Sequence, residues 1–379
     1  MKRSFRNILL SLVVSSICFA CQSDYDIITN GVYLTDAQSA QMKKVTIDDT
    51  GAKTVISSRL GALAESDITV EYGVNAQALS DFNKKNGTNY QLLPETYYSF
   101  SENQTIIKAG NIASAPVELI IKPFDDQIDE SKKYAIPVSI IGASGAECLQ
   151  ASSNLIVILD QVIVTTVPYL GTGNQIVTSL SQPINGLSSW TLEWNLRMDA
   201  FNRNNVTQWR IMDANNKLIL YSRFGDVTCE QNQFQVKFGE NKPASLTRFT
   251  ANKWYHLALT YDGANLRLYV DGKLDFTFPH SSPGEVFSFK DIQYANSDSR
   301  YSLKGKVSEL RVWSVARSQA EIENNMYVVS PDTPGLEVYW KCNDNNGLVI
   351  KDYTNKGRDG KLAKEATWEE GVRFPDTEK

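Results

Sequence analysis

Apolar and polar residues alternate along many short segments of the chain, a pattern typical of β-strands with one buried face. The alternation is clearest in Ile-Thr-Val-Glu-Tyr at 68–72. Similar or more apolar short segments, bounded by turn residues, recur at 44–47, 117–122, 134–141, 155–159, 190–198, 209–212, 217–224, 234–238, 254–261, 265–270 and 306–313. The pattern predicts an all-β protein built as sandwiches.

Helical signals interrupt the strands at two places. Asn75 is a good N-cap, residues 76–85 place Leu79 and Phe82 on one side, and Gly87 supplies the stop. A second, short helix is expected to begin near Ser318. Neither changes the predicted class.

Residues 161–172 divide the chain into two predicted domains. Pro168, Gly171 and Gly173 follow one set of strands and precede another, so they are expected to break any strand ladder there. We therefore predict one domain at 21–163 and another at 164–379.

The first domain carries the stretch VEYGVNAQALSDFNKKNGTNYQLLPETYYSF at 70–100 and KKYAIPVSI at 132–140. These resemble an N-terminal domain of unknown function found in surface lipoproteins of glycan-utilisation loci. The many short strands predict an immunoglobulin-like β-sandwich here, and the resemblance implies that it acts as a stalk or spacer.

The second domain carries WYHLALTYDGANLRLYVDGK at 254–273, GKVSELRVWSVARSQAEI at 305–322 and GLEVYWKCNDNNGLVIKDYTNKGRDGKL at 335–362. These blocks, in this order, resemble the laminin G-like, concanavalin A-like family. The resemblance implies a jelly-roll β-sandwich that binds carbohydrate or protein.

The N-terminus predicts export and a lipid anchor. Lys2, Arg3 and Arg6 precede the apolar run Ile8–Ala20, which is too short for the roughly 30 Å of a bilayer core and fits a signal peptide at 1–20. Cys21 then stands where the lipobox of bacterial lipoproteins has its acylated cysteine, although Phe19 and Cys18 depart from that motif. Cleavage elsewhere, giving a soluble protein, is the alternative.

The residues after Cys21 extend this prediction. Acidic residues follow in Gln22–Asp26, as in lipoproteins exported to the outer face of the outer membrane; a soluble tether would have the same composition. We expect the membrane to be contacted through the lipid alone, because no later segment approaches a membrane span.

Charge and cysteine content exclude several classes. The 379-residue chain has a formal net charge of −5 without a basic patch, which argues against nucleic-acid binding. Cys148, Cys229 and Cys342 fit no zinc pattern. Cys229 and Cys342 are either a disulfide or, as favoured here, free thiols.

Catalytic residues are sparse, so we expect no enzyme. The sequence has two histidines, His256 in a strand motif and His280 in a loop, and no G-x-S-x-G motif. Glycosidases on this fold alternate two carboxylates along a strand, but Glu193 shares its polar face with Asn195 and Arg197.

A binding site is expected at loops of the second domain. Trp190 and Trp194 alternate with leucines and are assigned to the core. Loops on a rigid sandwich concentrate binding residues, and the carbohydrate-binding candidates near them are Trp209, Arg210, Tyr294, Asn296, Arg300 and Tyr301. The resemblance also implies calcium; Asp298 is the candidate ligand, with Asp226 and Asp352 as further carboxylates.

Three functional hypotheses follow. The first is a surface lipoprotein that captures a glycan, with an outer-membrane glycan transporter or surface glycosidases as partners. The second is a protein-interaction or adhesion module. The third is a glycoside hydrolase acting through Glu193.

Overall fold

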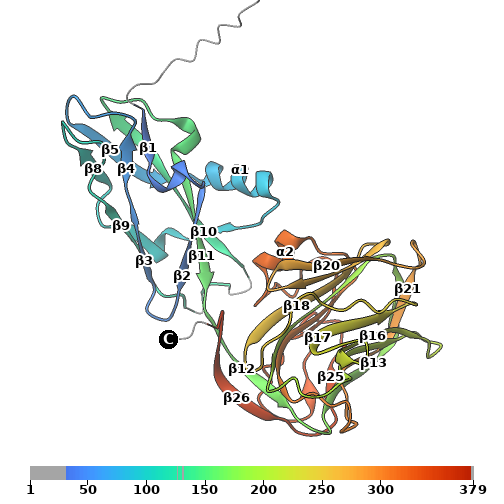
Figure 1. The fold of residues 1–379 in the computed structure, drawn as a ribbon. Helices are drawn as coiled ribbons and strands as arrows, with labels where there is room; N and C mark the ends of the chain where they lie inside the picture. Colours follow the sequence, from blue (N-terminus) through green and yellow to red (C-terminus); the bar gives the residue numbers. More distant parts are fainter. Residues whose placement is uncertain (1–30, 126, 130–131, 377–379) are drawn as a thin grey trace, which may run out of the picture.

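The computed structural model describes residues 31–125, 127–129 and 132–376, and these form two β-domains joined end to end (Figure 1). Strands β1–β11 and helix α1 belong to the first domain, and β12–β26 and helix α2 to the second. The all-β prediction is confirmed. In the described part of the chain, no helix is long and apolar enough to cross a membrane. The predicted signal peptide and Cys21 lie outside the described residues.

The N-terminal domain is a sandwich of a six-stranded and a three-stranded sheet, with a small two-stranded sheet at one end. The large sheet has the order β2-β11-β10-β5-β8, with β6 beside β10, and the others are β3-β9-β7 and β1-β4. The strands are β1 (Val32–Leu34), β2 (Met42–Ile47), β3 (Ala52–Ile56), β4 (Ser58–Leu60), β5 (Ile68–Val74), β6 (Gln91–Leu92), β7 (Tyr98–Phe100), β8 (Gln104–Ile107), β9 (Val117–Ile121), β10 (Tyr134–Ser144) and β11 (Asn154–Gln161). Short 3₁₀ turns occupy Asp36–Gln38, Glu95–Tyr97 and Gln150–Ser152.

Helix α1 (Ala76–Asn86) lies on the outer face of the six-stranded sheet. The Asn75 side chain accepts hydrogen bonds from the N–H groups of two residues in the first turn, and Gly87 ends the helix in the left-handed conformation. Leu79 packs on β10 and β11. The predicted helix is therefore confirmed, cap and stop included.

The C-terminal domain is a jelly roll of two large sheets. The eight-stranded sheet has the order β20-β19-β18-β14-β22-β12-β26, with β23 beside β22, and the seven-stranded sheet the order β17-β16-β15-β21-β13-β25-β24. The strands are β12 (Ile163–Leu170), β13 (Gln175–Leu187), β14 (Trp190–Met198), β15 (Val206–Met212), β16 (Leu218–Asp226), β17 (Cys229–Phe238), β18 (Trp254–Tyr261), β19 (Asn265–Val270), β20 (Lys273–Pro279), β21 (Phe287–Ala295), β22 (Gly305–Trp313), β23 (Leu336–Trp340), β24 (Val349–Ile350), β25 (Gly360–Leu362) and β26 (Thr367–Phe374).

Large aromatic side chains fill the space between these two sheets. Trp190 and Trp194 of β14 are fully buried, as the sequence predicts. Trp194 contacts Trp209 and Phe234 from the opposite sheet, with ring centroids 5.9 and 5.5 Å apart. Burial of these rings stabilises the domain, because each removes a large apolar area from water.

The sequence predicts that the strand ladder is broken at the junction between the domains, but the structure has a strand there. Val162 alone separates β11 from β12, and β12 is an ordered strand between β22 and β26. It pairs with β22 only at Tyr169 and Leu170. Pro168 therefore lies where one side of the strand has no ladder, a position at which proline is tolerated.

Helix α2 (Gln319–Asn324) lies on the side of the jelly roll that faces the N-terminal domain (Figure 1). It begins with a capping box in which Ser318 and Glu321 each bond the other's backbone N–H. The predicted start near Ser318 is confirmed.

The aromatic core yields a stability prediction. We expect Trp194→Ala to lower the free energy of unfolding by about 3–5 kcal/mol, because it leaves a large cavity at the centre of the sandwich. Urea denaturation followed by circular dichroism measures this loss. Trp368→Ala on the edge strand β26, where the ring is partly buried, is the matched control and should cost less; equal losses would contradict a core centred on Trp194.

Candidate functional site

Two of the predicted ligand-binding aromatics, Trp209 and Tyr294, belong to the core. Both side chains are 0% exposed, and their rings pack edge to face with centroids 5.1 Å apart. The Tyr294 hydroxyl donates to Oε1 of Gln208 at 2.8 Å. The prediction that they contact a ligand is wrong. Strand β15 already begins at Val206, so Trp209 lies inside the strand on its inward side and not at a loop tip.

The other predicted loop residues form a self-contained turn. Asn296 accepts a hydrogen bond from the N–H of Asp298 at 2.9 Å, and Arg300 reaches back to the Asp298 carboxylate at 2.6 Å. The same guanidinium lies over the ring of Tyr301, 5.2 Å from its centroid. The structure therefore brings these four residues together, and the contacts they form are mainly with one another.

The carboxylates proposed for calcium have protein partners. Hydrogen bonds from Arg300 lower the pKa of Asp298 to about 2, and Asp226 pairs with Arg223 at 2.6 Å. Asp352 accepts hydrogen bonds from the backbone and hydroxyl donors of a tight turn. Ca²⁺ needs about six to eight oxygen ligands, and the described residues contain no cluster of three or more candidate metal-binding side chains. The surroundings of these carboxylates do not fit a calcium site.

Arg210 has a different position from its neighbour Trp209. It points outward from the inner strand β15 of the seven-stranded sheet, directly between Tyr221 on β16 and Gln293 on β21. Its guanidinium forms no hydrogen bond or ion pair within the described residues. An unpartnered guanidinium that is half-buried on a sheet face has its donors available for a ligand.

A continuous row of outward side chains passes through Arg210 and crosses the whole sheet. Each member pairs with the next across adjacent strands. All are exposed or half-buried, whereas the residues beside them in each strand are mostly core. At about 4.8 Å per strand, seven strands make a row of about 29 Å. We name it the outer row; it consists of Lys237, Tyr221, Arg210, Gln293, Val177, Lys361 and Val349.

A groove of 540 Å³ lies along the outer row beside Arg210. Its walls include the charged ends of Asp291 and Lys361 and the apolar side chains of Val177 and Met212. Gln293 is held by hydrogen bonds from its amide nitrogen to Gln175 and to the Ala295 carbonyl. The groove therefore combines fixed donors and acceptors with an apolar floor.

The outer face of the eight-stranded sheet is covered instead. Glu193, which is 0% exposed, accepts from Arg311 at 2.9 Å and from Arg317 at 2.6 Å. The two arginines also donate to the carbonyls of Asn325 and Glu321 in and just after α2. The helix and its continuation thus close over a charged cluster in which Glu193 is paired with both arginines.

Two acidic groups share the charge of this buried cluster. Arg311 pairs with both Glu193 and Glu309, and the Tyr339 hydroxyl donates to Glu309 at 2.6 Å. Burial by itself would raise the pKa of Glu193, but Arg317, His256 and Arg311 outweigh it and hold the pKa below its ordinary range. The lowered pKa keeps Glu193 ionised inside this buried cluster.

The described histidines and cysteines lie in buried or half-buried positions. Burial lowers the pKa of His256, which lies 3.5 Å from Glu193 inside the same cluster. Cys148, Cys229 and Cys342 are free thiols, so Cys229 and Cys342 do not pair. Burial holds the pKa of Cys342 well above its ordinary value.

This geometry can be set against known families. Residues 170–323 match the laminin G-type model of the concanavalin A-like lectin/glucanase superfamily. The C-terminal domain belongs to that superfamily. Residues 28–147 match a second family model, described as an N-terminal domain. Both resemblances drawn from the sequence are confirmed.

Two solved structures are similar to this chain to different extents. A candidate carbohydrate-binding protein from Bacteroides ovatus matches over 92% of this chain and 100% of its own, with a TM-score of 0.57 and 22% identity. A pentraxin from Limulus polyphemus matches 45% of this chain and 83% of its own, with a TM-score of 0.35 and 14% identity.

One curated relative shares a short stretch of sequence. Mouse pappalysin-1 is 31% identical over 91 residues, which amount to 23% of this chain and 6% of pappalysin-1. The chain thus spans a small part of that relative's length.

The covered face of the laminin G-type domain yields a second stability prediction. We expect Glu193→Gln to lower the free energy of unfolding by about 3–5 kcal/mol, because it leaves two buried arginines short of a counter-charge. Glu230→Gln, which removes an exposed pair with Arg248, should cost no more than about 1 kcal/mol. Urea denaturation compares the two; similar losses would contradict a structural role for Glu193.

The same cluster predicts a dependence on pH. A carboxylate whose pKa is lower in the folded than in the unfolded chain stabilises the fold fully above its ordinary pKa of 4.5. That stabilisation is lost as the pH falls below this value. As the pH is lowered below 4.5, the difference in free energy of unfolding between the wild-type chain and Glu193→Gln should therefore become smaller. Denaturation by urea at a series of pH values measures it. A difference in free energy that stays constant at all pH values would argue against the lowered pKa.

Proposed function

We propose that this chain is a non-catalytic carbohydrate-binding lipoprotein whose laminin G-type domain captures a glycan chain along the outer row. The observation that carries the proposal is Arg210 on the inner strand β15, whose guanidinium lies on an open sheet face and has no partner within the described residues. Planar polar groups of this kind hold the hydroxyls of sugars, which both donate and accept hydrogen bonds.

The composition of the outer row supports a sugar ligand. Arg210, Gln293 and Asp291 provide donors and acceptors, and Val177 and Met212 provide apolar contacts for the C–H faces of a sugar ring. The length of about 29 Å suits an extended oligosaccharide better than a single ring. The B. ovatus protein of the same architecture is itself named for carbohydrate binding.

The proposed absence of catalysis rests on Glu193. Glycosidases on this fold need two solvent-accessible carboxyl groups close together. The strand residue that best fits such a role, Glu193, is enclosed by two arginines and covered by the segment that includes α2.

The proposed location rests on the N-terminal sequence. A lipid on Cys21 would hold the chain in the outer membrane, facing the exterior, and the N-terminal sandwich would act as the spacer. The open outer row would then be available to polysaccharides, with a glycan transporter or surface glycosidases as partners that receive the captured chain.

The central test is loss of glycan binding in an Arg210 variant. We expect Arg210→Ala to weaken binding of a polysaccharide found by glycan-array screening about tenfold or more, because charged hydrogen bonds are removed. Affinity electrophoresis measures the change. Arg300→Ala, which removes an exposed arginine already paired with Asp298, is the control.

Several outcomes would refute the proposal. If no glycan of a broad panel binds, or if Arg210→Ala binds as tightly as the wild-type chain, the outer row is not the binding site. Hydrolysis of a bound glycan would remove the non-catalytic assignment. A protein partner recovered from the outer membrane, with no competition by sugars, would favour the adhesion hypothesis.

Lipid attachment has its own test. Cells grown with labelled palmitate should incorporate it into the wild-type chain and not into Cys21→Ala, because the acylated thiol is gone. Cys148→Ala should label normally. Persistent labelling of Cys21→Ala would show that Cys21 is not the acylated residue.

A further inference from the structure

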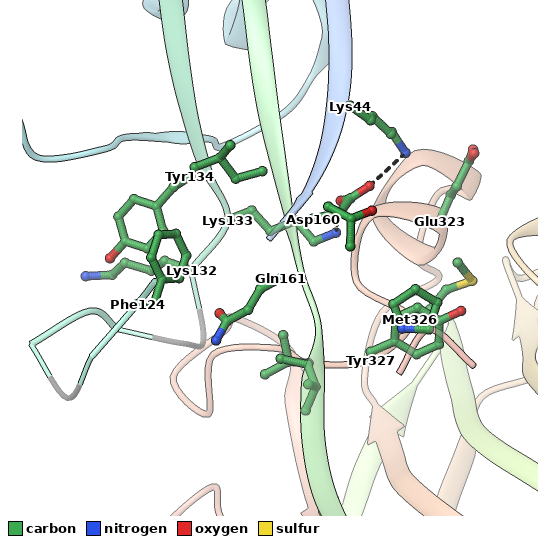
Figure 2. Close-up of a pocket in the computed structure, with 15 residues that line it drawn as sticks. Lys44, Phe124, Lys132, Lys133, Tyr134, Asp160, Gln161, Glu323, Met326 and Tyr327 are labelled. Carbon is green, nitrogen blue, oxygen red and sulfur yellow. Dashed lines mark ion pairs between the residues drawn. The ribbon is translucent and has the colours of Figure 1, made fainter. Parts of the chain in front are cut away.

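A second, smaller cavity lies between the two domains (Figure 2). Its volume is 200 Å³, and it is bordered by β2, β10 and β11 of the N-terminal domain and by α2 and the residues that follow it. The hydrogen bond from the Tyr90 hydroxyl to Asn324, 3.1 Å long, joins the domains nearby. A molecule in this cavity would touch both domains at once.

The N-terminal wall carries one carboxylate between two lysines. Asp160 lies 3.6 Å from the Lys133 ammonium and 4.0 Å from that of Lys44. Both distances exceed the roughly 2.7–2.9 Å of a close charged hydrogen bond, so the carboxylate oxygens can accept another donor. The hydroxyl of Thr46, on the neighbouring strand, has no hydrogen-bond partner within the described residues.

The C-terminal wall brings an anion and an aromatic ring. Figure 2 shows Glu323 facing the Lys44–Asp160 pair, with Met326 and Tyr327 further along the same wall. Glu323 forms no ion pair or hydrogen bond through its side chain in the described part of the chain. The Tyr327 ring is fixed by stacking on Phe374, with an interplanar angle of 17°.

The protonation states of the cavity are set by burial and by charge. Burial raises the pKa of Tyr327 to about 12, helped by Asp271 and Asp160, so its hydroxyl remains a donor at neutral pH. Burial also lowers the pKa of Lys133, and the nearby charge of Asp160 partly offsets this lowering. Donors and acceptors are therefore both present around neutral pH.

The balance of charge restricts the ligand. Among the described residues that line the cavity, Lys44 and Lys133 face Asp160 and Glu323, and the other charged side chain, Lys132, pairs with Asp129 at 3.2 Å. An anionic ligand would meet two carboxylates and a cationic one two ammonium groups. A neutral molecule that both donates and accepts hydrogen bonds, with a C–H face for Tyr327 and Met326, meets no such repulsion.

We propose that this interdomain cavity is a second binding site, for a single neutral sugar unit, distinct from the outer row. The volume of 200 Å³ is below the range of about 300–1,000 Å³ usual for drug-sized ligands, which suits one ring and not an extended chain. Because the ligand contacts both domains, its binding also holds their relative orientation.

The test uses the full chain and a panel of neutral monosaccharides, namely glucose, galactose, mannose, xylose and N-acetylglucosamine, measured by isothermal titration calorimetry. At least one should bind saturably. Glu323→Ala and Thr46→Val, one from each wall, should weaken that binding about fivefold or more. Neither side chain has a partner in the described fold, so both variants should fold normally, as circular dichroism would verify.

Arg210→Ala separates the two sites, because it should weaken polysaccharide binding about tenfold or more while leaving the monosaccharide affinity unchanged. Glucuronate and glucosamine should bind more weakly than their neutral counterparts. Failure of every monosaccharide, unchanged affinity in both cavity variants, or loss of monosaccharide binding in Arg210→Ala would each overturn the second site. Loss of polysaccharide binding alone bears only on the outer row.

Discussion

Burial of large aromatic rings between the two sheets of the laminin G-type domain governs the rest of its structure. Trp194 from one sheet meets Trp209 and Phe234 from the other, and Trp190 meets Phe238 and Phe289, all of them buried. Because side chains alternate across a strand, fixing these rings inward fixes their neighbours outward. The position of Arg210 on the open face is thus a direct consequence of the burial of Trp209 beside it.

One outer face of the sandwich is covered and the other is open, and the difference has a physical reason. Polar residues on β14 and β22 would be expensive to bury alone, and here Glu193 and Arg311 neutralise each other while α2 and the segment after it supply the remaining acceptors. Along the outer row of the seven-stranded sheet, the described residues are exposed or half-buried, and Arg210 has no partner among them.

The short connection between the domains lets the N-terminal domain take part in the proposed binding of a single sugar. Since β11 continues into β12 through Val162 alone, the N-terminal sandwich is attached closely enough to contribute a wall to the interdomain cavity. Its role as a proposed spacer therefore does not leave it outside the binding chemistry. A glycan chain would lie on one face of the molecule, and a single sugar would sit where the two domains meet.

The sequence by itself determined the features that depend on local residue chemistry and on the spacing of apolar residues. Asn75 and Gly87 delimit a helix, the alternation around Trp190 and Trp194 assigns them to the core, and the motif blocks identify the C-terminal fold. Only the tertiary structure decided the register between strands distant in sequence. That register buried Trp209 and Tyr294, closed two arginines around Glu193 and aligned Arg210 with residues from six other strands. No local pattern contains this information, because each pairing joins segments that the chain brings together only on folding.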